Sequence, residues 1–212
     1  MWASLALPWR VCLEEAWTAF CAGSLPIGAC VVAADGQVLA RGRNRIDETE
    51  GEAPYVHHNT LAHAELNALL ALRVPYSDRE SSILYTTTEP CPLCMGAIYM
   101  SGVHTLHYAA RESHAGSTNL LGTTPYLSRK PIKVFGPPDP RLEALVTALI
   151  VEVELASWRS AQNVVIKAWR GVIPQGVELG EQLFQSGELR RMQADKWSAD
   201  QVVDKLMGMV SL

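Results

Sequence analysis

The chain has 212 residues, 48% of them hydrophobic, and a formal net charge of −4 at pH 7. Enough apolar material is present for a core, which excludes a wholly disordered chain, and the acidic balance disfavours a long polyanion as the main ligand. No apolar run reaches the length that spans a bilayer, and five scattered cysteines do not form a secreted disulfide framework.

The N-terminus is apolar over residues 1–8, but it is short and lacks a basic leader, so it is not typical of a signal peptide. We therefore expect a cytoplasmic protein that does not use a membrane as a partner.

The first third of the chain predicts a helix followed by a hairpin. Apolar residues recur with helical spacing over residues 11–22, and Gly23 is a plausible stop. A continuous apolar run over residues 27–34 predicts a buried strand. Asp35 and Gly36 then predict a tight turn, and residues 37–43 the returning strand.

A polar, acidic segment, residues 46–60, predicts a loop, and residues 61–73 predict a helix capped by Asn59 or Thr60. Further along we expect strands at residues 82–88, 103–109 and 132–135. Residues 92–100 predict a helix closed by Gly102, and a long helix is expected from Pro140 to about Trp158.

Strands that alternate with helices indicate an α/β domain made of layers. We place this domain at residues 1–160 and a C-terminal extension at residues 161–212. The extension contains two helical candidates, residues 178–184 and 199–210. A lid, a helical extension and an oligomer contact all remain open as its role.

Three arginines alternate near the end of the second predicted strand, Arg41, Arg43 and Arg45. Alternate residues of a strand share one side. We interpret them as a solvated strand edge, with contact to phosphate or nucleic acid as the less favoured alternative. Of the cysteines outside the motif below, Cys12, Cys21 and Cys30 are expected to be small apolar packing residues.

Two short motifs carry the chemistry, His63-Ala64-Glu65 and Pro90-Cys91-Pro92-Leu93-Cys94. Cysteines three residues apart at a helix start point their thiolates the same way, and the helix N-terminus stabilises their charge. One histidine and two thiolates give zinc three protein ligands and leave its fourth position for water. Such a water becomes nucleophilic near pH 7, and Glu65 is placed to move its protons.

The combination of H-x-E and P-C-x-x-C is typical of zinc nucleobase deaminases. The chain resembles the cytidine deaminase-like superfamily, in particular its guanine deaminases and tRNA adenosine deaminases, over residues 26–158. The resemblance includes Pro26-Ile27-Gly28-Ala29, Gly42-Arg43-Asn44, His63-Ala64-Glu65, and the run Thr88-Glu89-Pro90-Cys91-Pro92-Leu93-Cys94-Met95-Gly96-Ala97-Ile98.

This resemblance implies a three-layer α/β/α fold with a central five-stranded mixed sheet, and a homodimer or larger oligomer. It implies that His63, Cys91 and Cys94 bind Zn²⁺ and that Glu65 is the acid/base residue. It also implies substrate contacts, at Asn44, Ala64, Pro90 and His114.

We favour a free nucleobase, a nucleoside or a related small amino-heterocycle as substrate, guanine-like or another purine, with ammonia released. A tRNA-specific adenosine deaminase is the alternative, and nucleic acid is the less favoured partner because the chain is acidic. A third hypothesis is a non-catalytic structural zinc module, which would need a fourth protein ligand such as His57 or His58. Both are otherwise expected to be exposed loop residues.

Overall fold

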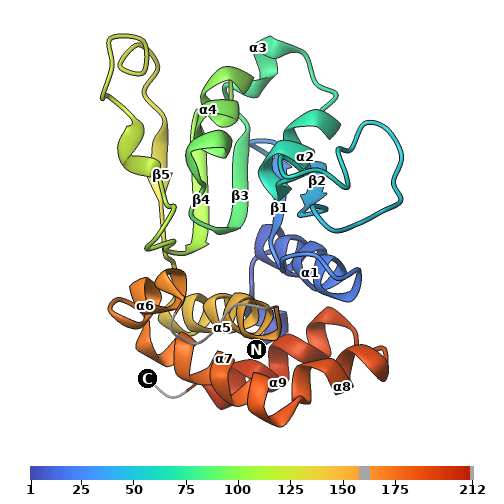
Figure 1. Ribbon diagram of the computed structural model, residues 1–212. Helices are drawn as coiled ribbons and strands as arrows, with labels where there is room; N and C mark the ends of the chain where they lie inside the picture. Colours follow the sequence, from blue (N-terminus) through green and yellow to red (C-terminus); the bar gives the residue numbers. More distant parts are fainter. Residues whose placement is uncertain (158–162, 211–212) are drawn as a thin grey trace.

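A mixed sheet forms the centre of the computed structural model, which describes residues 1–157 and 163–210 (Figure 1). Within this described part the sheet has five strands in the order β2-β1-β3-β4-β5. Their bounds are β1 Gly28–Val32, β2 Val38–Arg43, β3 Ile83–Thr88, β4 Thr105–Ala110 and β5 Lys133–Phe135.

Of these five strands, β1 alone runs opposite to the other four. β1 pairs antiparallel with β2 and with β3, whereas β3, β4 and β5 are parallel. β1 is buried along its whole length. Ala29 and Val31 join one core cluster and Cys30 and Val32 another, because successive side chains point to opposite faces.

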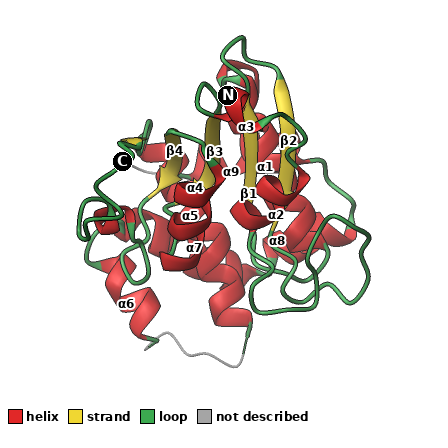
Figure 2. Cartoon of the chain, turned by 90° about the horizontal axis from the view of Figure 1, so that it is seen from above, coloured by secondary structure: helices red, strands yellow, loops and turns green. Residues whose placement is uncertain are grey.

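Helices cover both faces of the sheet, which confirms the predicted three-layer α/β/α architecture (Figures 1 and 2). α2 (Ala64–Ala71) and α4 (Pro92–Ser101) share a core with β1, β3 and β4. α1 (Leu7–Cys21) and α5 (Pro140–Ala156) cover the other face.

Several predicted boundaries are wrong by a few residues. α1 begins at Leu7 because Pro8, which lacks an N–H, is well placed in a first helical turn. α2 begins at Ala64 and ends at Ala71, so the predicted helix over 61–73 is too long. Its N-cap is His63 rather than Asn59 or Thr60; the Asn59 side chain instead accepts from the Leu61 N–H in a turn before the helix.

The C-terminal extension is helical, as predicted, but the two predicted helices are joined by two more. Its elements are α6 Val164–Arg170, α7 Pro174–Ser186, α8 Glu188–Ala194 and α9 Ala199–Met209. They pack against α5 and α1 and lie at the bottom of the molecule in Figure 1. The proposed boundary near residue 160 and the helix end expected at Trp158 lie outside the described residues, so the division into two units stays a prediction.

Three short elements were not expected from the sequence: η1 Trp2–Ser4, α3 Tyr76–Arg79 and η2 Thr118–Leu120. None of the helices in the described ranges combines the length and apolarity that crossing a bilayer requires.

Candidate metal and catalytic site

The two sequence motifs meet at the N-termini of two neighbouring helices. His63 is the N-cap of α2, and Cys91 is the N-cap of α4, with Cys94 in the first turn of α4. α2 and α4 contact each other on the same face of the sheet. Both helix N-termini therefore place partial positive charge where thiolates are expected.

Ligand atoms of His63, Cys91 and Cys94 lie within 4.8 Å of one another. The Nδ1 of His63 is 3.5 Å from the Cys91 Sγ and 3.4 Å from the Cys94 Sγ. Zinc bonds of about 2.3 Å to sulfur and about 2.0 Å to nitrogen separate tetrahedral donors by about 3.5 Å. The three side chains therefore fit a zinc ion, as the sequence predicts.

The electrostatics of this cluster suit a cation. The interaction with the Cys94 thiol, assisted by His63, lowers the pKa of Cys91 to about 4. The bond to Cys91 raises the pKa of His63, while the same Cys91 neighbour and burial raise the pKa of Cys94. A bound divalent cation would favour deprotonation of both thiols and of the imidazole.

Glu65 lies in the first turn of α2 and is only 4% exposed. The Thr86 hydroxyl donates to its Oε1 at 3.1 Å, and the Cys94 Sγ is 3.3 Å from its Oε2. Burial raises the pKa of Glu65. The carboxyl group is thus fixed beside the metal ligands without joining the three-residue metal cluster found in the described residues.

A hollow of about 540 Å³, open to solvent, contains this chemistry. His63, Glu65 and Cys91 line one part of it. The other lining residues come from the loop before β1, the end of β3 and the segment after β4: Leu25, Ile27, Thr88, Glu89, Glu112 and Ala115.

The four predicted substrate contacts are not among the residues that line the hollow. Asn44 is buried and its Oδ1 accepts from the Ile46 N–H, so it shapes the turn after β2. The carbonyl of Pro90, itself buried, accepts from the Ser117 N–H. His114 is exposed, one residue before the lining residue Ala115.

Ala64 is fully buried as the first residue of α2, where its N–H has no partner within the helix. Its predicted role, and those of the other three contacts, stay predictions.

Sequence reasoning missed Thr86, Thr88 and Glu112 as site residues. A usable signal existed for the threonines, because residues 86 and 88 of a strand share a face, and that face carries the metal site. Glu112 gave no signal, since it lies in the irregular segment after β4. Asn67 was also missed: its amide donates to the carbonyls of Arg43 and Val56 and fastens the loop over 46–60 to α2.

Other histidines and cysteines lie apart from this cluster in the described part of the chain. His57 is half-buried and His58 is exposed, and neither joins the cluster. Cys12 and Cys30 are buried with their sulfur atoms 3.6 Å apart, as expected for packing residues. Cys21 is exposed, so its predicted packing role is wrong.

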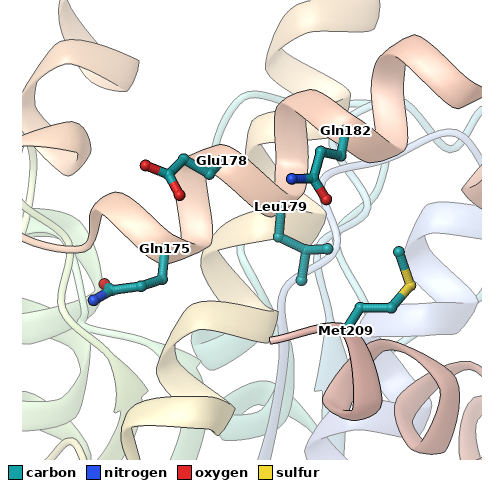
Figure 3. A pocket seen from close by; sticks show the side chains of 5 residues that line it. All are labelled: Gln175, Glu178, Leu179, Gln182 and Met209. Atoms are coloured by element: carbon teal, nitrogen blue, oxygen red, sulfur yellow. The ribbon is translucent and has the colours of Figure 1, made fainter. Parts of the chain in front are cut away.

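A separate shallow hollow lies on the extension, between α7 and α9 (Figure 3). It carries no metal-ligating cluster in the described residues. Its lining residues are Gln175, Glu178, Leu179, Gln182 and Met209.

Comparison with known proteins places this site in a family. The model of the cytidine and deoxycytidylate deaminase zinc-binding region matches residues 7–110. A cytosine deaminase from Candida albicans is 32% identical over 114 residues, which are 53% of this chain and 70% of the relative. A guanine deaminase from Bacillus subtilis is 36% identical over 92 residues, covering 42% of this chain and 53% of the relative.

A tRNA-specific adenosine deaminase from Bacillus subtilis is 34% identical over 116 residues, covering 51% of this chain and 63% of the relative. The chain thus spans 53–70% of the length of these three curated relatives.

Two solved structures are similar to this chain. A guanine deaminase from Nitrosomonas europaea aligns with a TM-score of 0.51 at 27% identity, covering 70% of this chain and 85% of that chain. A protein crystallised with 2,6-diaminopurine aligns with a TM-score of 0.53 at 28% identity, covering 72% of this chain and 84% of that chain.

Proposed function

The chain belongs to the cytidine and deoxycytidylate deaminase family, and we propose that it removes the amino group of a small heterocycle by zinc-dependent hydrolysis, releasing ammonia. The substrate is a free nucleobase, a nucleoside or a related compound, with guanine-like purines favoured. One observation carries the proposal: His63, Cys91 and Cys94 converge beside the buried Glu65 in a hollow open to solvent.

Bound zinc would supply the Lewis acidity that makes a water molecule nucleophilic near neutral pH. His63, Cys91 and Cys94 would hold the ion. Glu65 takes a proton from the attacking water and gives it to a ring nitrogen of the substrate. It then takes the remaining proton of the added hydroxyl and passes it to the amino group, which leaves as ammonia. The Thr86 hydroxyl holds one oxygen of Glu65 and so fixes the orientation of the carboxyl group.

A small substrate is favoured over tRNA because the arginines of β2 and of the segment after it are already paired. Arg43 and Arg45 both bind the buried Glu48, and Arg41 pairs with Glu14 of α1. A second hollow, which shares Leu25 with the first, has no Lys or Arg among its described lining residues. Phosphate groups, which account for most of the affinity of RNA for proteins, find little positive charge there.

A catalytic zinc site is favoured over a structural one by the number of ligands. Within the described residues the cluster has three potential protein ligands, and neither His57 nor His58 supplies a fourth. Zinc is normally four-coordinate. The remaining position is therefore available for the reacting water.

Replacement of the acid/base residue tests the activity. We expect Glu65→Gln to keep about one zinc ion per chain and to lose at least a thousandfold in ammonia release, because proton transfer typically contributes about 10²–10⁴. Zinc is measured by atomic emission and ammonia by a coupled assay. Native activity in this variant would refute the role of Glu65.

Replacement of a ligand tests the metal site separately. Cys91→Ser is expected to lose most of its zinc together with activity, since zinc favours thiolate over hydroxyl. Exposed Cys21→Ser is the matched control and should retain both. Equal zinc contents in the two variants would remove Cys91 from the ligand set.

The substrate is identified by ammonia release from guanine, adenine, cytosine, their nucleosides and a tRNA anticodon stem-loop. We expect activity on a free purine or its nucleoside. Activity on the RNA alone would instead establish the tRNA alternative. A homodimer and a cytoplasmic location stay predictions, which sedimentation and fractionation would test.

A further inference from the structure

The hollow that contains the metal ligands is also lined by three polar side chains that the mechanism above does not use, Thr88, Glu89 and Glu112. Thr88 follows Thr86 by two residues in β3, so both side chains lie on the face of the sheet that carries the site. The Thr86 hydroxyl reaches Glu65, whereas Thr88 lies one step nearer the end of the strand, beside Glu89.

The Thr88 hydroxyl is a buried polar group without a partner. The residue is 5% exposed, and its Oγ1 makes no hydrogen bond within the described part of the protein. Thr87, which points to the other face, has its hydroxyl bonded to the Gly28 N–H. Buried hydroxyl groups in native proteins are nearly always paired, so the orphaned Thr88 hydroxyl indicates a partner that binds in the hollow.

Glu112 offers a fixed hydrogen-bond acceptor in the same hollow. Its Oε1 accepts from the N–H groups of His114 and Ala115, at 2.8 and 3.2 Å, which anchors the carboxylate to its own loop. Its Oε2 accepts from no described residue, and Glu112 forms no ion pair among them. The neighbouring Glu89 differs, because the Thr118 hydroxyl and the Glu112 N–H occupy its two oxygens.

An open carboxylate oxygen in a partly desolvated site selects an N–H donor and repels an acceptor. Among the common amino-bases, guanine alone has a ring N–H next to the carbon that carries the reacting amine. In adenine and cytosine the ring nitrogen next to that carbon is an acceptor. The chemistry of the hollow therefore distinguishes these substrates.

We infer that Glu112, assisted by the Thr88 hydroxyl, accepts the ring N–H beside the reacting carbon and so selects a guanine-type base over adenine or cytosine. This inference rests on the proposed function and specifies the substrate class of the same site. Glu112 is a specificity-determining residue, whereas Glu65 transfers the protons.

Glu112→Gln gives a sharp test because the backbone N–H groups of His114 and Ala115 would hold the amide oxygen. The amide NH₂ would then replace Oε2 and turn an acceptor into a donor. We would measure the Kd of guanine and of adenine by calorimetry, with zinc-loaded protein in a Glu65→Gln background that stops turnover.

We expect Glu112→Gln to bind guanine at least about tenfold more weakly, because a donor would then face the ring N–H of guanine and one hydrogen bond would be lost. The affinity for adenine should be unchanged or higher. Thr88→Val keeps the shape but removes the hydroxyl, and should weaken guanine binding about threefold or more. Thr88→Ser should restore it. Glu178→Gln on α7, in the separate hollow of Figure 3, is the carboxylate control and should bind both bases as the parent does.

Tighter binding of adenine than guanine by the parent would overturn the inference, as would an equal loss for both bases in Glu112→Gln. Binding of guanine by the parent, without ammonia release by the native protein, would refute the proposed activity and leave the role of Glu112 in recognition standing. Absence of guanine binding by the parent would refute the inference alone, and ammonia release from the other bases and nucleosides would then decide the proposed activity.

Discussion

Thr86 acts at the scale of a single hydrogen bond. Its hydroxyl donates to the Oε1 of Glu65 in a place where both side chains are buried. A carboxyl group that must accept and release protons needs a fixed orientation, and a positioned neighbour provides it. A polar side chain of β3 can therefore position a site residue only if it lies on the face of the sheet that carries the site.

We predict that Thr86→Val lowers kcat about tenfold and leaves the zinc content unchanged, because the Glu65 carboxyl loses one anchoring bond. Steady-state kinetics and metal analysis on the same sample check this. Thr86→Ser, which keeps a hydroxyl, should recover most of the rate. A Thr86→Val enzyme with native kcat would show that the bond has no positioning role.

His107 is a second residue whose environment has a measurable consequence. Its ring stacks between Tyr85 and Phe135, with ring centroids 4.7 Å from each, and burial lowers its pKa. The folded state therefore binds a proton less readily than the unfolded chain. His107 does not affect the free energy of unfolding at a pH where its ring is neutral in both the folded and the unfolded state. The free energy of unfolding falls when the pH drops through the ordinary histidine pKa of about 6.5, because the unfolded chain then binds the proton more readily.

We predict that the urea midpoint of zinc-loaded protein decreases between about pH 7.5 and 5.5 partly because of His107. His107→Phe, which preserves the stack, should show a smaller decrease over the same range. Chemical unfolding followed by circular dichroism gives both midpoints. The same pH dependence in variant and native protein would assign the effect to other groups.

At the scale of elements, α7 packs closely on α5 through two glycines. A Cβ at Gly180 would lie 2.6 Å from the Val151 Cβ and 2.9 Å from the Ala148 carbonyl oxygen; at Gly176 it would lie 2.7 Å from the Thr147 Cβ. Such distances are too short for a real Cβ. The glycines are therefore required by the close approach of the two helices and not by a turn.

We predict that Gly180→Ala lowers the free energy of unfolding by about 1–3 kcal/mol, because the cost of overpacking exceeds the gain in helix propensity. Gly208→Ala in α9 is the matched control, since a Cβ there would meet no atom within 4 Å. It should be neutral or stabilising by up to about 1 kcal/mol. Urea titrations measure the free energy of unfolding of both variants. An equal change in the two would mean that α7 moves to accommodate the added Cβ without loss of stability.

At the scale of the whole molecule, the C-terminal extension (α6 to α9) shares one hydrophobic core with the helices that cover one face of the sheet. Side chains of α6, α7, α8 and α9 belong to the same buried cluster as those of α1 and α5. An ion pair with one buried partner adds to this connection: the partly exposed Arg190 of α8 makes two hydrogen bonds, each 3.0 Å long, to the buried carboxylate of Glu152 in α5. The Glu152 side chain is only 2% exposed, and Arg190 supplies the cation that pairs with it.

We predict that Arg190→Ala lowers the free energy of unfolding by about 2–4 kcal/mol, because it leaves a buried carboxylate unpaired. Arg170→Ala, which removes a more exposed pair with Glu181, should cost less than about 1 kcal/mol. The double variant Arg190→Met, Glu152→Leu should recover part of the loss. Similar unfolding curves for Arg190→Ala and Arg170→Ala would refute this account.

The sequence by itself determined the local features of this protein. Strand periodicity, the Asp35-Gly36 turn and the Gly102 stop were readable because they depend on neighbours along the chain. The candidate metal ligands His63, Cys91 and Cys94 were readable because zinc requires particular donor types at particular spacings, and the structure brings the three side chains together.

The tertiary structure alone decided what depends on contacts between distant segments. Glu112 enters the hollow by way of an irregular segment after β4, and Thr88 is orphaned only because β3 buries it there. The start of α2 at Ala64 and the four helices of the extension were likewise set by packing, in which burial against other elements outweighs local propensity.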